Sequence, residues 1–243
     1  MGLLRDRRCD RHLLHCYLGI GMSKKADEAK RTQVWSCGGG VQSTAIAALI
    51  VQGKLPVPDY SAIVDTNREL SSTWQYMNEV TKPALLKVGC ELHRIDKRDF
   101  ATVDLFGGKD GDSLLIPAFS TKGDDIGKMP GYCSAEWKSR VLNRWLRKNN
   151  VNAADLWMGI STDELKRATF PEGAWQKKYP LIEIRMNRGD CMAIVERMGW
   201  PTPPRSSCWM CPNHTQQEWR DIKENHKEDW AKAVVFEKHI QKT

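Results

Sequence analysis

The sequence predicts an α/β fold, a doubly wound and mostly parallel sheet of five strands with helices on both faces, followed by a helical C-terminal part. Short apolar runs alternate with helical segments, which is the pattern of parallel strands joined by crossover helices. The first of these runs leads directly into three glycines and then an apolar segment of helical length. With 243 residues, 41% of them hydrophobic, the chain is long enough to bury a core.

The individual elements follow from local patterns. The expected strands are 32–36, 60–65, 91–95, 155–160 and a short fifth at 179–184. The expected helices are 44–52, 71–88, 134–149, 188–198 and 215–241, the last as one helix or two joined. Pro83 should interrupt its helix, Ser134 should act as an N-cap, and Pro180 should confine the fifth strand to an edge. Residues 106–132 show no periodicity and are expected to form a long loop.

Charge and composition limit the environment and the partners. The net charge of +7 favours a polyanionic partner such as a nucleotide, DNA or RNA, although a merely basic surface would give the same value. No apolar run is long enough to cross a membrane, and residues 1–21 lack the apolar centre of a secretory signal. We therefore expect a cytoplasmic protein, with residues 1–21 an extension and Met22 a more natural start. In that setting the eight cysteines are free thiols or metal ligands.

The residues around the first strand end form a candidate anion site. Gly38, Gly39 and Gly40 allow the backbone to approach an anion closely, and the helix that follows adds the positive end of its dipole. Ser36 and Ser43 can donate from their hydroxyl groups. The segment is neither a Walker loop nor a dinucleotide-binding glycine motif. The alternative is a glycine turn needed only for tight packing of strand against helix.

Several motifs in the same order resemble the phosphoadenosine phosphosulfate (PAPS) reductase family, within the adenine nucleotide α-hydrolase-like, or PP-loop, proteins. They are SCGGGVQST at 36–44, DTNRE at 65–69, Cys133 with Lys138, GISTDELKR at 159–167 and YPLI at 179–182. The resemblance covers residues 32 to about 214. It implies a nucleotide-binding domain at 32–200, a cysteine-containing segment with a C-terminal helix at 201–243, and a flexible extension at 1–31.

The resemblance also implies roles for single residues. The residues it implies for nucleotide binding are Ser36, Gly38, Gly39, Gly40, Gln42, Ser43, Asp65, Thr66, Glu69 and Gly159. Lys138, Arg167 and Cys133 would take part in catalysis, the two cations by meeting the anionic end of the substrate. The alternative for Lys138 and Arg167 is a solvated charge on the surface.

Two departures from the family pattern leave the reaction open. ATP-cleaving members carry Asp where this chain has Gln42, and an amide is a poorer Mg²⁺ ligand than a carboxylate. Gln42 thus resembles the branch that acts on PAPS without a metal, although Mg²⁺ stays open as an additional ion. That branch, however, uses a nucleophilic cysteine in its C-terminal tail, and no cysteine follows Cys211 here. The sequence therefore leaves ATP and PAPS as alternative nucleotides.

The cysteines form a second group of candidate functional residues. Cys208 and Cys211 form a CxxC pair, which can hold a metal, act as a redox pair or simply be buried. The resemblance makes Cys133 the third ligand, with Cys191, His214 or no residue as the fourth. We favour a [4Fe-4S] cluster over zinc.

Two classes of function remain. The first is an enzyme of sulfur chemistry, which either uses ATP to insert sulfur into a substrate such as a nucleic acid or reduces a sulfonucleotide. Its partners would be a nucleic-acid substrate, a reductant or a sulfur-donor protein, and a homo-oligomer is compatible with the sequence. The second is a non-catalytic nucleotide- or nucleic-acid-binding module with a structural zinc. A DNA-binding factor is a weaker third option. The Trp residues and the basic helix at 134–149 allow it, but Trp residues at helical spacing more often belong to a core.

Overall fold

The computed structural model describes residues 31–107, 113–122 and 125–241. The expected extension at 1–31 therefore lies, apart from Arg31, outside the described residues. The described residues from Thr32 onward form one compact unit. Within the described ranges, every helix is too short or too polar to span a bilayer.

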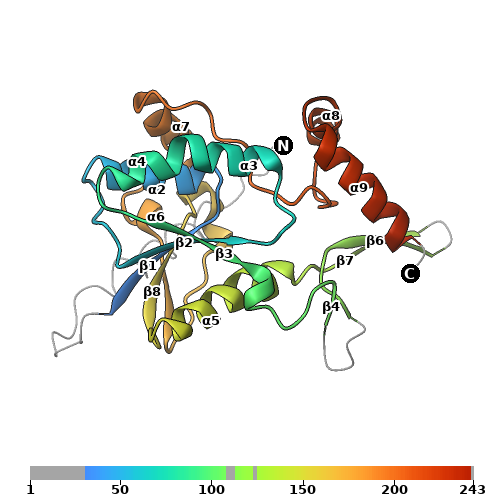
Figure 1. Cartoon of the computed structure of the whole chain (residues 1–243), viewed down its shortest axis with the longest axis horizontal. Coiled ribbons are helices and arrows are strands. Elements are labelled where there is room, and N and C mark those ends of the chain that lie inside the picture. The colour runs from blue at the N-terminus through green and yellow to red at the C-terminus, as the bar shows by residue number, and fades with distance from the viewer. Residues whose placement is uncertain (1–30, 108–112, 123–124, 242–243) are drawn as a thin grey trace, which may run out of the picture. The chain divides into compact units, whose positions relative to one another are not determined.

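The centre of this unit is a sheet of five strands in the order β3-β2-β1-β8-β9 (Figure 1). The strands are β1 (Thr32–Cys37), β2 (Tyr60–Asp65), β3 (Leu92–Asp96), β8 (Ala154–Met158) and β9 (Trp175–Lys178). All neighbouring pairs run parallel, and Val34 at the centre of β1 pairs with Tyr60 on one side and Leu156 on the other. The predicted parallel α/β sheet is confirmed.

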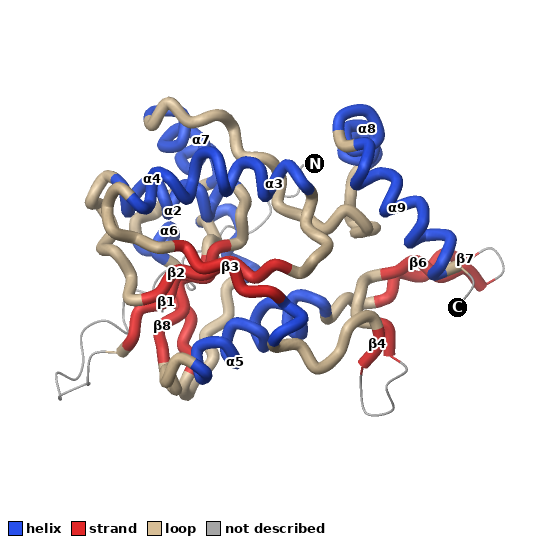
Figure 2. Tube along the Cα trace, viewed as in Figure 1, coloured by secondary structure: helices blue, strands red, loops and turns tan. Residues whose placement is uncertain are grey.

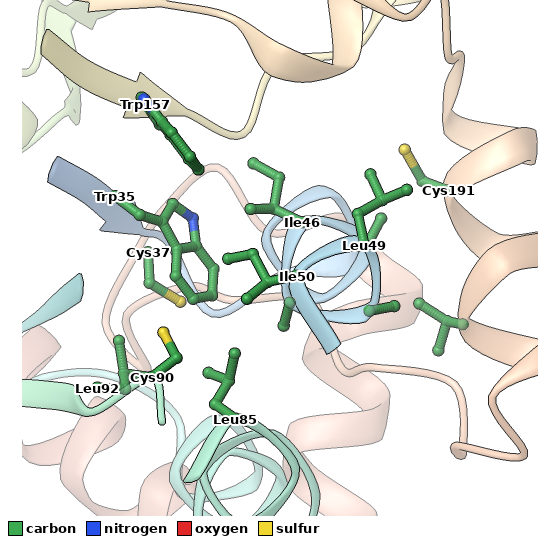
Figure 3. Packing of buried hydrophobic residues seen from close by; sticks show 14 of the residues in the cluster. Trp35, Cys37, Ile46, Leu49, Ile50, Leu85, Cys90, Leu92, Trp157 and Cys191 are labelled. Carbon is green, nitrogen blue, oxygen red and sulfur yellow. The ribbon is translucent and has the colours of Figure 1, made fainter. Parts of the chain in front are cut away.

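One face of the sheet is covered by three helical elements. They are α2 (Val41–Val51), α7 (Arg188–Arg197) and a long stretch made of α3 (Ser71–Tyr76), a π-helical turn (Met77–Thr81) and α4 (Lys82–Leu86). Figure 3 shows Trp35 of the sheet beside Ile46 and Ile50 of α2, and all three side chains are buried. The helix α2 is buried along almost its whole length, which explains why its sequence is apolar on every side.

The opposite face is covered by α5 (Arg140–Lys148), which lies across the sheet from α2 and α4 (Figure 2). Its apolar stripe, Val141, Leu142 and Leu146, packs on Val34 and other sheet residues. Helices therefore lie on both faces, as predicted. A π-helical turn, Ser134–Ser139, precedes α5, and Cys133 stands at its start. The prediction that Ser134 caps this helix is wrong, because helical backbone already begins at Cys133.

The fifth strand is displaced from its predicted position. Residues 175–178 form the edge strand β9, whereas the YPLI segment forms the short helix α6 (Pro180–Glu183). Pro180 sits in the first turn of α6, where its missing N–H costs nothing and its fixed φ favours the helix. The prediction of a strand at 179–184 is therefore wrong, because Pro180 begins a helix there.

Residues 106–132 also depart from the prediction, because they contain two small hairpins rather than a single loop. The strands β4 (Phe106–Gly107) and β5 (Ser113–Leu114) form one, and β6 (Ala118–Lys122) and β7 (Asp125–Met129) form the other. Residues 126–129 of β7 are exposed in succession, so no alternation of polar and apolar residues signals the strand.

The C-terminal part is helical, as predicted, and consists of two helices. They are α8 (Gln216–Asn225) and α9 (Lys227–Ile240), which meet at His226. Thr215 and Glu218 cap α8 reciprocally. The buried carboxylate of Asp229 in α9 accepts a 2.7 Å hydrogen bond from the Ser71 N–H at the start of α3. The C-terminal helices are thereby tied to the sheet domain.

Two adjacent leucines in α4 test this account of the core. Leu85 is fully buried, whereas its neighbour Leu86 is 60% exposed. Leu85→Ala should lower the free energy of unfolding by about 2–5 kcal/mol, because it removes buried methyl groups and leaves a cavity. Leu86→Ala should change it by less than about 0.5 kcal/mol. Urea denaturation of both variants measures the difference, and equal effects would contradict the assigned packing.

Candidate functional site

The turn between β1 and α2 is closed by its own side chains and by its glycines. The Gly38 N–H donates a 2.8 Å hydrogen bond to Ser43 Oγ, which draws the turn back onto the first turn of α2. Gly39 has a φ of 76°, in the left-handed region, and a Cβ there would lie 2.9 Å from Thr73 Cγ2. Glycine at position 39 is therefore required by backbone conformation and by space.

The start of α2 presents free backbone donors. The helix has no side-chain cap, and among the described residues no acceptor lies on the N–H groups of Val41, Gln42 and Ser43. Gly159, just after β8, lies against this turn, and a Cβ on it would be 3.1 Å from Ser43 Oγ. The ends of β1 and β8 thus meet at a helix N-terminus that favours an anion.

The position of this turn within the sheet is the one where open α/β sheets bind ligands. The chain leaves β1 towards β2 and β3 on one side, then returns to β8 on the other side. The strand order reverses between β1 and β8, which leaves a crevice beyond their carboxyl ends. The glycine turn and Gly159 line that crevice.

A polar cavity of about 430 Å³ occupies the crevice. Its lining residues are Gly38, Gly40, Val41, Gln42, Ser43, Gly159, Glu164, Arg167, Arg188, Arg205 and Ser206. Three of them are arginines, so the cavity combines backbone donors with fixed positive charge and fits a polyphosphate or another polyanion.

The arginines of this cavity are held by neighbouring polar groups. Arg167 pairs with Glu164 at 2.5 Å, Arg205 pairs with Glu218, and Arg188 donates to Gln42 Oε1 at 3.3 Å. Sequence reasoning identified Arg167 and missed Arg188 and Arg205. Arg188 opens α7, where a cation faces the positive end of the helix dipole, and this unfavourable placement was the available signal.

Gln42 is occupied by hydrogen bonds within the site. Its amide nitrogen donates to Glu164 Oε2 at 3.0 Å and to Ser161 Oγ at 3.4 Å, while its oxygen faces Arg188. A metal ion at this oxygen would have to displace a guanidinium. The donor set around Gln42 therefore does not fit Mg²⁺, because the Arg188 guanidinium already lies at the oxygen that the ion would need.

The remaining nucleotide candidates are placed at the ends of β1 and β2. Ser36 lies inside β1, paired with Ala62 and Met158. The buried carboxylate of Asp65 accepts hydrogen bonds from Arg94 and from the Asn67 N–H, so it shapes the turn after β2. The Asp65 carboxylate is therefore already hydrogen-bonded to other groups of the protein.

Beside the glycine turn lies an ion pair whose carboxylate is buried and whose lysine is half-exposed. Lys138 Nζ is 2.6 Å from Glu69 Oε1, and the Glu69 side chain is only 2% exposed. Ser206, which lies 3.4 Å from a Cβ built on Gly39, also donates to Glu69 at 3.4 Å. Burial opposes the charge on Lys138, but the charge and hydrogen bond of Glu69, together with the nearby Cys208 and Cys133, outweigh it and raise the pKa of Lys138. The lysine is thus held as a cation next to the cavity.

The CxxC segment is attached to the strand-end loop that carries Glu69. Glu69 and Cys208 form an antiparallel β-bridge, the Leu70 N–H donates to the Ser207 carbonyl at 3.0 Å, and the Trp209 N–H donates to the Arg68 carbonyl at 2.8 Å. Cys208 Sγ lies 3.7 Å from Thr66 Oγ1. Backbone pairing therefore fixes the first cysteine beside Thr66 and Glu69.

The three family-matched cysteines gather in this region. Burial raises the pKa of Cys208 to about 12, with the charge of Glu69 as a further cause, and burial together with Cys211 raises the pKa of Cys133. Cys133 and Cys208 both pack against one buried cluster, which consists of Ile116, Trp137 and Met210. Across the described ranges, however, no three His, Cys, Asp or Glu side chains lie close enough together to hold one metal ion.

The two candidates for a fourth ligand have different positions. His214 Nε2 bonds to the Cys208 carbonyl at 2.9 Å, while its buried Nδ1 has no hydrogen-bond partner among the described residues and lies 3.8 Å from Glu218 Oε2. Cys191 is instead fully buried between α7 and α2, next to Leu49 in Figure 3. The structure brings His214 to the CxxC segment and leaves Cys191 in the hydrophobic core.

Removing either partner of the Glu69–Lys138 ion pair should lower stability by a different amount. Lys138→Met would leave the Glu69 carboxylate buried without a positive charge beside it and should lower the free energy of unfolding by up to about 3 kcal/mol. Glu69→Gln leaves a half-exposed lysine that water can solvate, so it should cost less than about 1 kcal/mol. Thermal and urea denaturation compare the two variants. A larger loss for Glu69→Gln would show that the pair is not buried as described.

Comparison with known proteins supports the fold. No protein-family model matches the sequence, and no curated protein does either. Among solved structures, a PAPS reductase from Candida auris in complex with phosphate is similar over 86% of this chain and 98% of its own, with a TM-score of 0.50 and 14% identity. The U34-tRNA thiolase NcsA from Methanococcus maripaludis, with its [4Fe-4S] cluster, is similar over 95% of this chain and 77% of its own, with a TM-score of 0.48 and 10% identity. The match to the PAPS reductase shows that the chain shares the fold of that enzyme, as its motifs predict.

Proposed function

We propose that this chain is an enzyme of sulfur chemistry that binds an adenine nucleotide at the glycine turn and handles sulfur at the neighbouring cysteines. The supporting observation is a continuous series of contacts between the two places. Ser206 lies over Gly39 and donates to Glu69, Glu69 pairs with Lys138, and Glu69 also bridges Cys208. A nucleotide in the cavity would have its anionic end next to the cysteines.

The nucleotide's negative charge would be balanced by protein groups. The free N–H groups of α2 and the three arginines of the cavity supply donors and positive charge. Because Gln42 is engaged by Arg188, the binding of phosphate would not depend on Mg²⁺ at this position. This arrangement favours a sulfonucleotide such as PAPS, with ATP as the other substrate to be tested.

The cysteine region fits a cysteine-ligated iron–sulfur cluster in its donor chemistry. Cys133, Cys208 and Cys211 are the thiols that would hold it, and each would bind as a thiolate after losing its proton. Such a cluster would supply an iron that can bind sulfide or transfer electrons. The chain's own contribution is the positive charge of Lys138 and the backbone pairing that fixes Cys208 beside Thr66.

One observation favours a second candidate function. His214 has a buried Nδ1 without a hydrogen-bond partner among the described residues, and its other ring nitrogen is held by a backbone carbonyl. This is how metal-bound histidines are commonly oriented. Together with three cysteines, it would fit a structural zinc in a non-catalytic nucleotide-binding module.

Arginine variants on α7 test the nucleotide site. Arg188→Ala should weaken binding of PAPS or ATP by about 10- to 100-fold, because it removes a charge-assisted contact to phosphate. Arg197→Ala, at the other end of the same helix, should bind like the parent protein. Calorimetric titration measures binding, while release of sulfite from PAPS or pyrophosphate from ATP identifies the reaction. Equal affinity of the two variants would rule out this cavity as the phosphate site.

Metal analysis of anaerobically purified protein distinguishes the two candidates. The enzyme proposal expects iron and acid-labile sulfide that are lost in Cys208→Ser and Cys211→Ser. Cys191→Ser should retain them, because Cys191 lies in the core between α2 and α7. Stoichiometric zinc without iron, lost in His214→Ala, would contradict the cluster and support the non-catalytic module.

A further inference from the structure

A second cavity lies beyond the carboxyl ends of β2 and β3. It has a volume of about 580 Å³. Its lining residues are Asn67, Arg68, Lys97, Arg98, Ala101, Thr102, Val103, Asp104, Leu105, Trp209 and Phe236. Trp209 directly follows Cys208, and its N–H donates to the Arg68 carbonyl, so this cavity adjoins the cysteine segment. The proposed nucleotide and sulfur sites use none of its side chains.

The charges at this cavity do not cancel. Arg68 and Lys97 both bond to the single carboxylate of Asp104, the arginine with two bonds of 2.8 Å. Lys97 is only 5% exposed and Arg68 15%, whereas Asp104 is 58% exposed. Two largely buried cations thus share one exposed anion. The excess positive charge lies where water screens it poorly, which favours a bound anion.

The two cations are held in place and retain donors for a ligand. Both lie over the ring of the buried Trp137, Arg68 at 4.8 Å and Lys97 at 4.4 Å from its centre. A guanidinium carries five N–H donors and an ammonium three, so the bonds to Asp104 leave donors on both groups. A phosphate could replace or supplement Asp104 without moving the cations.

The same cavity has an aromatic wall. Trp209 and Phe236 of α9 meet edge to face, with ring centres 5.9 Å apart, and both are half-buried. An aromatic pair that is only partly covered offers a free ring face beside the cations. Nucleobases stack on such faces, while phosphates bind to neighbouring cations.

We propose that this cavity binds one nucleotide, with its base against Trp209 or Phe236 and its phosphate at Arg68 and Lys97. The nucleotide could be a free mononucleotide or one unit of a single-stranded nucleic acid, since both present the same chemistry. The inference rests on the proposed function and deepens it, because it names a second nucleotide as the substrate class next to the cysteines. The net charge of +7 is consistent with a polyanionic ligand.

The test measures the binding of two kinds of ligand to the full chain. Fluorescence anisotropy follows a labelled single-stranded oligonucleotide, with uridine or adenosine monophosphate as unlabelled competitors, and calorimetry follows PAPS and ATP separately. Phe236→Ala should weaken oligonucleotide or mononucleotide binding by about tenfold through loss of stacking. Val235→Ala, on the same helix but 69% exposed, is the matched control and should have no effect.

A second pair of variants reports on charge. Arg68→Gln should lower the dependence of oligonucleotide affinity on salt by about 0.7 in log–log slope, the amount expected for one lost phosphate contact to a single strand. Arg220→Gln, an exposed arginine on α8, should change it less. All four variants should keep parental affinity for PAPS or ATP, because that ligand is assigned to the other cavity.

The outcomes separate this inference from the proposed function. Competition by mononucleotides supports a free nucleotide as the ligand, and binding of oligonucleotides alone supports a nucleic acid. No binding of either ligand, or equal losses in Phe236→Ala and Val235→Ala, would overturn the inference while leaving PAPS and ATP binding to be judged independently. Loss of PAPS or ATP binding in Phe236→Ala would overturn it as well, since one site would then serve both ligands.

Discussion

The polar cavity at the glycine turn depends on how closely the end of β1 approaches the start of α2. The turn uses three glycines, a left-handed backbone at Gly39 and the hydrogen bond from the Gly38 N–H to Ser43 Oγ. Gly159 lets the end of β8 lie against the same turn, with Ser43 only 3.1 Å from a built Cβ. These small residues leave a space at the reversal point of the sheet into which backbone donors point, and a Cβ at Gly39 or Gly159 would crowd the turn.

The second constraint is the attachment of the C-terminal segment. Residues 207–209 pair with the backbone of residues 68–70, so a segment near the end of the chain lies along the loop after β2. This pairing brings Ser206 to the glycine turn, Cys208 to Thr66, and Trp209 to the second cavity. One short stretch of chain therefore connects the polar cavity, the CxxC segment and the basic aromatic cavity.

Much of the fold could be predicted from local patterns in the sequence. The strands β1, β2, β3 and β8 follow from short apolar runs, because buried parallel strands have a strong local signature, and the helices of residues 188–197 and 216–240 lie within predicted helical segments. The edge strand was misplaced since Pro180 starts a helix, and the hairpins within 106–132 were missed since their strands are short and largely exposed. In the site, the glycine turn could be read from the sequence. Arg205 could not, because only tertiary contacts bring it there, and the one signal for Arg188 was its unfavourable place at the start of a helix.

The central claim is that the amides at the start of α2 bind the negative end of a nucleotide. Hydrogen–deuterium exchange of the full chain with and without PAPS or ATP tests it most directly. The account predicts slower exchange in residues 38–44 and around Gly159 on adding a nucleotide, with little change in β9 at the sheet edge. Unchanged exchange at the glycine turn under saturating nucleotide, or protection confined to another part of the chain, would contradict it.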